Sequence, residues 1–208
     1  MTPFQPITIN GNTLDAGRGT ALSFGDFADD AKGTNYIVVQ TSKEALEDAD
    51  YKVLDSHGVE LTDLVSDQTY LCRFKGTDLD TLRQLDFVSF VDTYKDAFVI
   101  HASLKQQAPT HQPLDAQGQQ AGVSNSVETV KVDIVLHVDS TGEDENVKQE
   151  IVSRTGVEPS TITIINKNLR ATLPYASLVK VAKIDLVQAI LPAHAVTLMI
   201  DRHSSSGE

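Results

Sequence analysis

Two stretches of the chain, "LRQLDFVSFV" (Leu82 to Val91) and "VAKIDLVQAI" (Val181 to Ile190), carry nearly the same pattern about one hundred residues apart. When Leu85 is aligned with Ile184, an offset of 184 − 85 = 99, the apolar positions coincide without a gap from Tyr70 onward. Solenoid repeats usually have periods of roughly 20 to 50 residues, so this period is too long for one of their units. The sequence therefore predicts a duplicated domain.

Working outward from these stretches, each copy shows the same series of elements. The run "YIVVQT" (Tyr36 to Thr41) in the first copy and "VDIVLHV" (Val132 to Val138) in the second are typical of strands, and an apolar pattern with helical spacing follows each. Tyr70, Cys72 and Phe74 then alternate as expected for a strand with one face in a core. The order strand, helix, strand, strand, helix, strand is that of a ferredoxin-like domain, with an antiparallel four-stranded sheet and both helices on one face. We therefore expect an α+β protein of two tandem ferredoxin-like domains joined by a flexible linker.

Single residues mark the expected ends of the first helix in each copy. Ser42 and Thr141 are candidate N-caps, because a hydroxyl can accept a hydrogen bond from the first free backbone N–H groups. Gly58 and Gly156 are candidate C-caps, because glycine adopts the left-handed conformation at little cost.

Composition along the chain sets the expected domain boundaries. The stretch between the copies is rich in Gln, Pro, Gly and Ser and has no hydrophobic period, which is typical of a linker. The start of the chain contains "ITINGNTLD", which predicts a small hairpin around Asn10, Gly11 and Asn12. The predicted parts are an N-terminal arm at 1–33, the first domain at 34–104, the linker at 105–126, the second domain at 127–201 and a tail at 202–208.

The bulk composition argues against several classes of partner. A net charge of −12 is poorly suited to binding nucleic acid, which requires clustered Lys and Arg. No apolar run approaches the roughly 18 residues of a membrane span. Cys72 is the only cysteine, so no internal disulfide can form, and the N-terminus lacks a secretory signal. These features favour a cytoplasmic location and leave the oligomeric state open.

Signatures of catalysis and metal binding are missing from the sequence. It contains no G-x-S-x-G, no H-E-x-x-H and no phosphate-binding loop, and its six histidines stand singly. The fragments "SHG" (Ser56 to Gly58) and "DSTG" (Asp139 to Gly142) fall at predicted helix ends, where no nucleophile is presented to a base. We therefore assign no catalytic residue, no cofactor and no metal, and favour a protein without enzymatic activity.

The sheet face opposite the helices is the most informative surface. In "YIVVQT" residues on both faces are apolar, and Val135 is apolar on the outer side of the second copy. We expect the outer faces to be covered by the sister domain or by a partner. His137 falls on the same side as Val135, and its plainest interpretation is a surface or interface histidine without chemistry.

These residues also resemble a known family. The runs "NYIVVQT" (Asn35 to Thr41), "VKVDIVLHV" (Val130 to Val138), "DLVQAILP" (Asp185 to Pro192) and "GVELTDLVSDQTYLCRFKGTDLDTLRQLDFVSFVDTY" (Gly58 to Tyr94) are similar to tandem propeptide-like domains of subtilisin-family serine proteases and to related stand-alone inhibitors. The resemblance covers roughly Asn35 to Ile200. Unlike the commonest arrangement in that family, no catalytic domain follows the second copy, so the sequence given is either a stand-alone protein or a fragment.

The resemblance implies a non-enzymatic inhibitor or folding assistant of a subtilisin-like protease. In the family, the sheet of a propeptide domain packs on two protease helices and its C-terminal segment enters the substrate cleft. On this chain the docking face would include Val135 and His137. The cleft segment would comprise Leu198, Met199, Ile200, Asp201, Arg202 and His203.

Two other interpretations remain open on the sequence alone. The two apolar sheet faces could pack on each other as in dimeric α+β barrel proteins, enclosing a pocket for a small apolar ligand or substrate with Tyr36, Val38 and His137 in its wall. The chain could also be an interaction module for a partner of another kind, because ferredoxin-like domains host many functions.

Overall fold

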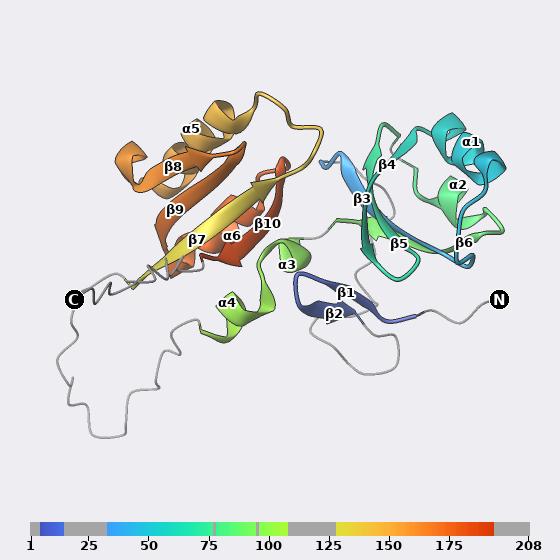
Figure 1. Ribbon diagram of the computed structural model, residues 1–208, viewed down its shortest axis with the longest axis horizontal. Coiled ribbons are helices and arrows are strands. Elements are labelled where there is room, and N and C mark those ends of the chain that lie inside the picture. The colour runs from blue at the N-terminus through green and yellow to red at the C-terminus, as the bar shows by residue number, and fades with distance from the viewer. Residues whose placement is uncertain (1–4, 15–32, 77, 95, 108–127, 194–208) are drawn as a thin grey trace, which may run out of the picture.

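The computed structural model describes residues 5–14, 33–76, 78–94, 96–107 and 128–193, and it has an α+β fold with three antiparallel sheets (Figure 1). The smallest sheet is the hairpin of β1 (Ile7–Ile9) and β2 (Asn12–Leu14). Asn10 and Gly11 form its turn with φ of 50° and 73°. Positive φ at both central residues is what a tight hairpin turn requires, which is why an Asn-Gly pair predicted it. The predicted hairpin is confirmed.

Residues 33–94, which we call the first unit, contain the first four-stranded sheet. Its strands are β3 (Tyr36–Thr41), β4 (Val59–Ser66), β5 (Thr69–Phe74) and β6 (Val88–Thr93), in the spatial order β4-β5-β3-β6. Helix α1 (Asp48–Ser56) joins β3 to β4, and α2 (Asp80–Arg83) joins β5 to β6. Leu54 of α1 and Leu82 of α2 lie in one buried cluster with Ile37 and Cys72 of the sheet, so both helices pack on the same sheet face.

Residues 128–193, the second unit, repeat this arrangement. The strands β7 (Thr129–Leu136), β8 (Ile162–Ile165), β9 (Asn168–Pro174) and β10 (Val187–Pro192) are ordered β10-β7-β9-β8. Helix α5 (Asp144–Thr155) joins β7 to β8, with a short 3₁₀ turn at Pro159–Thr161. A second 3₁₀ turn at Tyr175–Ser177 leads into α6 (Leu178–Ala182), which joins β9 to β10.

The strand register is also repeated. Ile37 faces Cys72 in the first sheet and Val132 faces Ala171 in the second, and all four residues are buried on the helix side. Counted along the chain, each sheet has its strands in the order fourth, first, third, second. The equivalence of the two registers allows any position of one sheet to be compared with its counterpart in the other.

The two opening stretches have the same structural role. "LRQLDFVSFV" begins in α2 and ends in β6, burying Leu82, Phe87 and Val91. "VAKIDLVQAI" begins in α6 and ends in β10, burying Val181, Ile184, Val187 and Ile190. The repeated motif is therefore the corner at which each second helix turns into the last strand.

The predicted helix starts were wrong by several residues. Ser42 does not cap α1, because its N–H donates to the Phe87 carbonyl (2.9 Å) and so extends the β3–β6 pairing. The N-cap of α1 is Glu47, whose N–H donates to the Asp50 carboxylate at 2.9 Å. Thr141 does not cap α5 either, because two successive turns follow β7 and the helix begins after Glu143.

The predicted C-cap of α5 is confirmed, whereas that of α1 is displaced by one residue. Gly156 ends α5 in the left-handed conformation at φ 72°. His57 is the C-cap of α1, and Gly58 follows it at φ 77°. In both helices the positive φ falls on the glycine, where the absence of a side chain permits it.

A short helical segment follows the first unit. It consists of α3 (Asp96–Val99) and α4 (Ala102–Gln106), and it lies against β10 in Figure 1. Ile100 forms a parallel bridge with Ile190, and the His101 N–H donates to the Ile190 carbonyl at 3.0 Å. Helix α4 thus runs two residues into the segment that we expected to be linker, because its residue Leu104 is buried against the second unit. The rest of the predicted linker, most of the N-terminal arm and the C-terminal tail lie outside the described residues.

Candidate functional site

The open face of the first sheet, meaning the face opposite its helices, is buried inside the molecule. At its centre Val38 of β3 faces Leu71 of β5, and these side chains are 1% and 0% exposed. They share one buried cluster with Ile7, Ile9 and Leu14 of the β1–β2 hairpin. The cluster continues into the core of the second unit. The hairpin therefore acts as a cover that turns the open face of the first sheet into part of a hydrophobic core.

The equivalent position in the second sheet has the opposite character. There Asp133 of β7 faces Arg170 of β9, and the guanidinium donates to both carboxylate oxygens at 2.6 and 2.8 Å. Both side chains are 29% exposed. Around them the open face carries the exposed residues Lys131, Thr163 and Thr172, together with the exposed apolar side chain of Ile165. This face is partly polar and no other described segment buries it.

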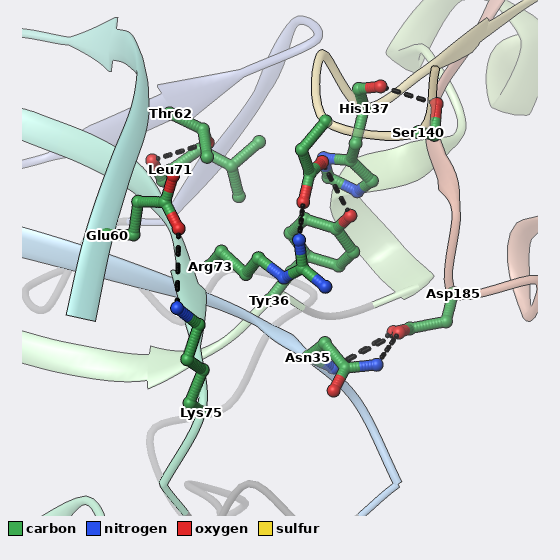
Figure 2. A network of polar contacts seen from close by, with 11 residues as sticks. Asn35, Tyr36, Glu60, Thr62, Leu71, Arg73, Lys75, His137, Ser140 and Asp185 are labelled. Atoms are coloured by element: carbon green, nitrogen blue, oxygen red, sulfur yellow. Dashed lines mark hydrogen bonds and ion pairs between the residues drawn. The ribbon is translucent and has the colours of Figure 1, made fainter. Parts of the chain in front are cut away.

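The two units meet at a pair of stacked rings. The imidazole of His137, just after β7, lies 3.5 Å from the ring of Tyr36 between centroids, with planes 5° apart (Figure 2). Tyr94, after β6, approaches the same imidazole edge-on at 5.9 Å. The Tyr94 hydroxyl donates to the Gln188 carbonyl of β10 at 2.6 Å. We call this group the aromatic joint.

Two carboxylates of the second unit tie the joint to the first. Asp139 accepts a hydrogen bond from the Tyr36 hydroxyl (2.8 Å) and forms an ion pair with Arg73 of β5 (3.0 Å). Asp185 accepts from the Thr34 hydroxyl at 2.6 Å. Figure 2 shows that it also accepts from Asn35, whose side-chain amide lies at 2.8 Å. Every one of these bonds crosses between the units, so the interface is specific as well as apolar.

Burial dominates the electrostatics of the joint. Removal from water lowers the pKa of His137 to about 4, although the nearby charges of Asp139 and Asp185 act in the opposite direction. The imidazole Nε2 is buried and has no hydrogen-bond partner. Burial, followed by the bond to Asp139, raises the pKa of Tyr36 above its ordinary value, and burial also raises that of Tyr94. The rings of the joint are therefore neutral, and the charged groups around them already have hydrogen-bond or ion-pair partners.

Two hollows adjoin the joint. A pocket of about 310 Å³ opens at the end of β7, and its walls include Val135, His137, Ser140, Lys167 and Gln188. This volume lies at the lower end of the range typical of small-molecule sites. A smaller space of about 80 Å³ lies between the units, with Tyr36, Tyr94 and Asp185 in its walls.

Neither "SHG" nor "DSTG" presents a serine hydroxyl to a histidine nitrogen that can take its proton. The Ser140 hydroxyl donates to the backbone carbonyl of His137, and the imidazole Nε2 of that residue has no partner. At the exposed end of α1 the Ser56 Oγ lies 3.3 Å from the His57 Nδ1, but both atoms are closer to the Val53 carbonyl, at 2.7 and 2.9 Å, to which each can donate. Within the described ranges, no group of three or more His, Cys, Asp and Glu side chains is arranged to hold a metal ion.

Two of the residues predicted for a partner-binding surface, Val135 and His137, line the same 310 Å³ pocket. Val135 is partly buried there, whereas His137 is 3% exposed and also stacks on Tyr36 in the joint. The predicted cleft segment, Leu198 to His203, lies outside the described residues. Of the three residues of the alternative pocket, Tyr36 and His137 are brought into contact, and Val38 lies under the hairpin.

The sequence analysis missed Arg73, Tyr94, Asp139 and Asp185. Arg73 lies two residues after Leu71 on the open side of β5. A charged residue in an otherwise apolar alternation is a sequence signal that could have predicted a polar contact there. Asp185 occupies the same position of the repeated motif as Asp86 does in the first copy. Because the motif is the same in both copies, it does not indicate that only Asp185 lies at the interface. Their partners come from positions about 45 to 150 residues away, a pairing that no local pattern reports.

Comparisons with known proteins add one match. A family model described as a domain of unknown function (DUF8729) matches residues 5–95, which include the β1–β2 hairpin and the first unit. Searches of curated proteins and of solved structures found no match. No helix in the part of the chain that the structure describes has the length and apolar character needed to cross a bilayer. The matched range thus spans the hairpin and the first unit together.

Proposed function

We propose that the chain consists of two tandem ferredoxin-like units and that the second unit is a propeptide-like docking module for a subtilisin-like serine protease. The protein would act as an inhibitor or folding assistant and would perform no catalysis itself. The strand order fourth, first, third, second in both sheets, with the helices on one face, supports the ferredoxin-like part of this proposal.

A single observation supports the docking part: no described segment covers the open face of the second sheet, whereas the hairpin covers that of the first. An antiparallel sheet can present one face to water or to a partner. In the first unit the hairpin occupies this face, so only the second unit can offer it to another protein. The proposal therefore assigns the docking role to the second copy and a supporting role to the first.

The chemistry of the free face suits a protein surface. Ile165 is 42% exposed, on the same sheet face as the ion pair of Asp133 and Arg170, whose side chains are 29% exposed. An apolar contact beside oriented charges gives both affinity and orientation, as is typical of interfaces that form between soluble proteins. At the end of the described chain, the Ala193 N–H donates to the Lys131 carbonyl on the same sheet. The segment from Leu198 to His203 would leave from there toward the protease cleft.

The barrel-like alternative needs two open sheet faces turned toward each other. The open face of the first sheet is packed against Ile7, Ile9 and Leu14, and Val38 is part of that packing. That unit therefore has no open sheet face left to pack against the other sheet, as a barrel-like pocket would need.

The test is inhibition of a panel of subtilisin-like proteases by the full chain and by two matched variants. Ile165→Asp places a charge on the free face, and we expect it to weaken inhibition about tenfold or more, because a charge would be buried without a partner. Val179→Asp makes the same change on α6, where Val179 is 54% exposed on the helix side of the same sheet, and we expect unchanged inhibition. Deleting residues 198–208 tests the cleft segment separately.

Three results would contradict the proposal. They are failure of the chain to bind or assist any protease of the panel, equal loss of inhibition in both aspartate variants, and no loss in either. Unchanged inhibition after deletion of residues 198–208 would remove the cleft segment from the mechanism while leaving docking through the sheet.

A further inference from the structure

The aromatic joint contains a titratable ring in an unusual setting. His137 comes from the second unit, whereas both rings that contact it, Tyr36 and Tyr94, come from the first. Its side chain is almost fully buried, and its Nε2 has no hydrogen-bond partner. A neutral imidazole is tolerated here, because one ring nitrogen without a hydrogen-bond partner lowers the stability of the folded chain only modestly. An imidazolium in the same place would bury a charge and an N–H group that needs an acceptor.

Among the described residues, the two carboxylates near the ring already accept hydrogen bonds from other groups. Element by element, the charged and titratable groups near the ring are Tyr36 on β3, Arg73 on β5, Tyr94 after β6, Asp139 in the turn after β7, Lys167 between β8 and β9 in the wall of the same pocket, and Asp185 before β10. Asp139 is engaged by the Tyr36 hydroxyl and by Arg73, and Asp185 by Thr34 and Asn35. Both tyrosines are buried and neutral in the acidic range, and Arg73 would repel an imidazolium.

We propose that the Tyr36–His137 stack is an acid-sensitive joint, and that protonation of His137 favours a form of the chain in which the two units have separated there. In the separated form the imidazole reaches water, where its charge is solvated. The stack and the hydrogen bonds made by Asp139 and Asp185 are lost together, because the same interface holds them. The proposal concerns the chain alone and stands whether or not a protease is its partner.

The direction of the pH effect follows from the lowered pKa. In the closed form the pKa of His137 is about 4, and for a solvated histidine it is about 6.5. The contribution of the neutral ring to closing is therefore complete above about pH 6.5 and declines as the pH falls toward 4. Between about pH 8 and about pH 5, these two values predict a weakening of the closing equilibrium of roughly 30-fold.

The experiment measures the distance between the units by fluorescence energy transfer in the full chain. Asp55→Cys on α1 and Ser153→Cys on α5 provide two exposed labelling sites, one on each unit. The native Cys72 is fully buried and its raised thiol pKa keeps it unreactive during labelling. We expect transfer to fall, reversibly, when the pH is lowered from about 8 to about 5.

Two histidine variants identify the responsible ring. His137→Phe keeps an aromatic ring for stacking but cannot be protonated, and we expect its transfer to stay constant over this pH range. His57→Gln removes an exposed histidine at the end of α1, and we expect it to respond as the parent chain does. The proposal is overturned if the parent chain shows no change, or if His137→Phe still responds.

A second measurement keeps the test decisive if the phenylalanine variant does not fold. The ring protons of the histidines can be titrated by NMR in the unlabelled chain, with His137→Gln used for assignment. We expect the midpoint of His137 to lie well below the value of about 6.5 for a solvated histidine, and a shift in the interface signals of Tyr36 and Tyr94 to accompany it. A His137 midpoint at about 6.5 would refute the idea.

Discussion

At one position of the sheet the two units carry side chains of opposite character. Val38 and Leu71 meet there in the first unit, and Asp133 and Arg170 meet there in the second. The helix-side neighbours of both pairs are equally apolar and equally buried. The difference therefore reflects only what covers the other face, which is the hairpin in one unit and solvent in the other.

This difference leads to a prediction about stability. We expect Leu71→Ala to lower the free energy of unfolding by about 2 to 5 kcal/mol, because it leaves a cavity between the sheet and the hairpin. Arg170→Ala at the equivalent position should have a much smaller effect, since an ion pair at the surface contributes little after solvent screening. Urea denaturation of the two variants beside the parent chain measures both values. Equal losses would mean that the free face of the second sheet is covered in solution.

At the aromatic joint the decisive property of each residue is its protonation state. Tyr36 donates a hydrogen bond only while its hydroxyl is protonated, and burial together with Asp139 raises its pKa. His137 stacks without a charge only while it is neutral, and burial lowers its pKa to about 4. Both shifts favour the uncharged rings near neutral pH, so the interface is most stable where both are neutral.

At the scale of elements, the strands and corners that occur in both units could be predicted from the sequence, whereas the helix starts could not. The strands and the corners between second helix and last strand followed from alternation and from the duplicated motif, because their cores are built the same way twice. The starts of α1 and α5 did not follow, since Ser42 extends the sheet and Thr141 lies within consecutive turns. The first outcome depends on a hydrogen bond to the distant Phe87, and the second on two local turns, Ser140 to His137 and Glu143 to Ser140, that compete with an early helix start.

The site residues show the same division. Tyr36 was selected because it is apolar on the outer face of its strand, and His137 because it falls on the outer side with Val135; the structure brings the two rings into contact. That contact is made between two units about one hundred residues apart along the chain, so its partners Arg73, Asp139 and Asp185 were not predictable from spacing. A sequence pattern reports which face a side chain takes, but not which distant surface that face meets.

The end of α5 offers a prediction at the same scale. Gly156 has φ 72° with no atom near the position that a Cβ would take, so a side chain there meets conformational strain but no clash. We expect Gly156→Ala to lower the free energy of unfolding by about 1 kcal/mol, and Ser153→Ala, on the exposed side of the same helix, to change it little. Thermal or urea unfolding would show the difference. An alanine variant as stable as the parent would mean that α5 does not end in a left-handed turn.

At the scale of the whole molecule, the two helix-side cores differ in their connections. The core between the first sheet and its helices is a closed cluster that includes Ile37, Leu54 and Leu82. The core of the second unit is continuous with the open face of the first sheet, with α3 and α4, and with the hairpin. The hairpin is thus the first part of a cluster that reaches from Ile7 to Ile190, although it is far from the second unit in sequence.

This continuity predicts that damage to the hairpin is transmitted beyond it. Ile9 is buried in the shared cluster, whereas its neighbour Thr8 is exposed on the other side of β1. We expect Ile9→Asp to lower the free energy of unfolding by at least about 3 kcal/mol, because a carboxylate would be buried without a partner, while Thr8→Asp should be nearly neutral. Hydrogen exchange should then show lost protection at β3 and β5 and also at β10, with the α1 and α2 side of the first unit least affected. Loss confined to β1 and β2 would show instead that the hairpin is an independent attachment. A single family model matches the hairpin and the first unit over residues 5–95, which is what a cooperative unit of the two would produce.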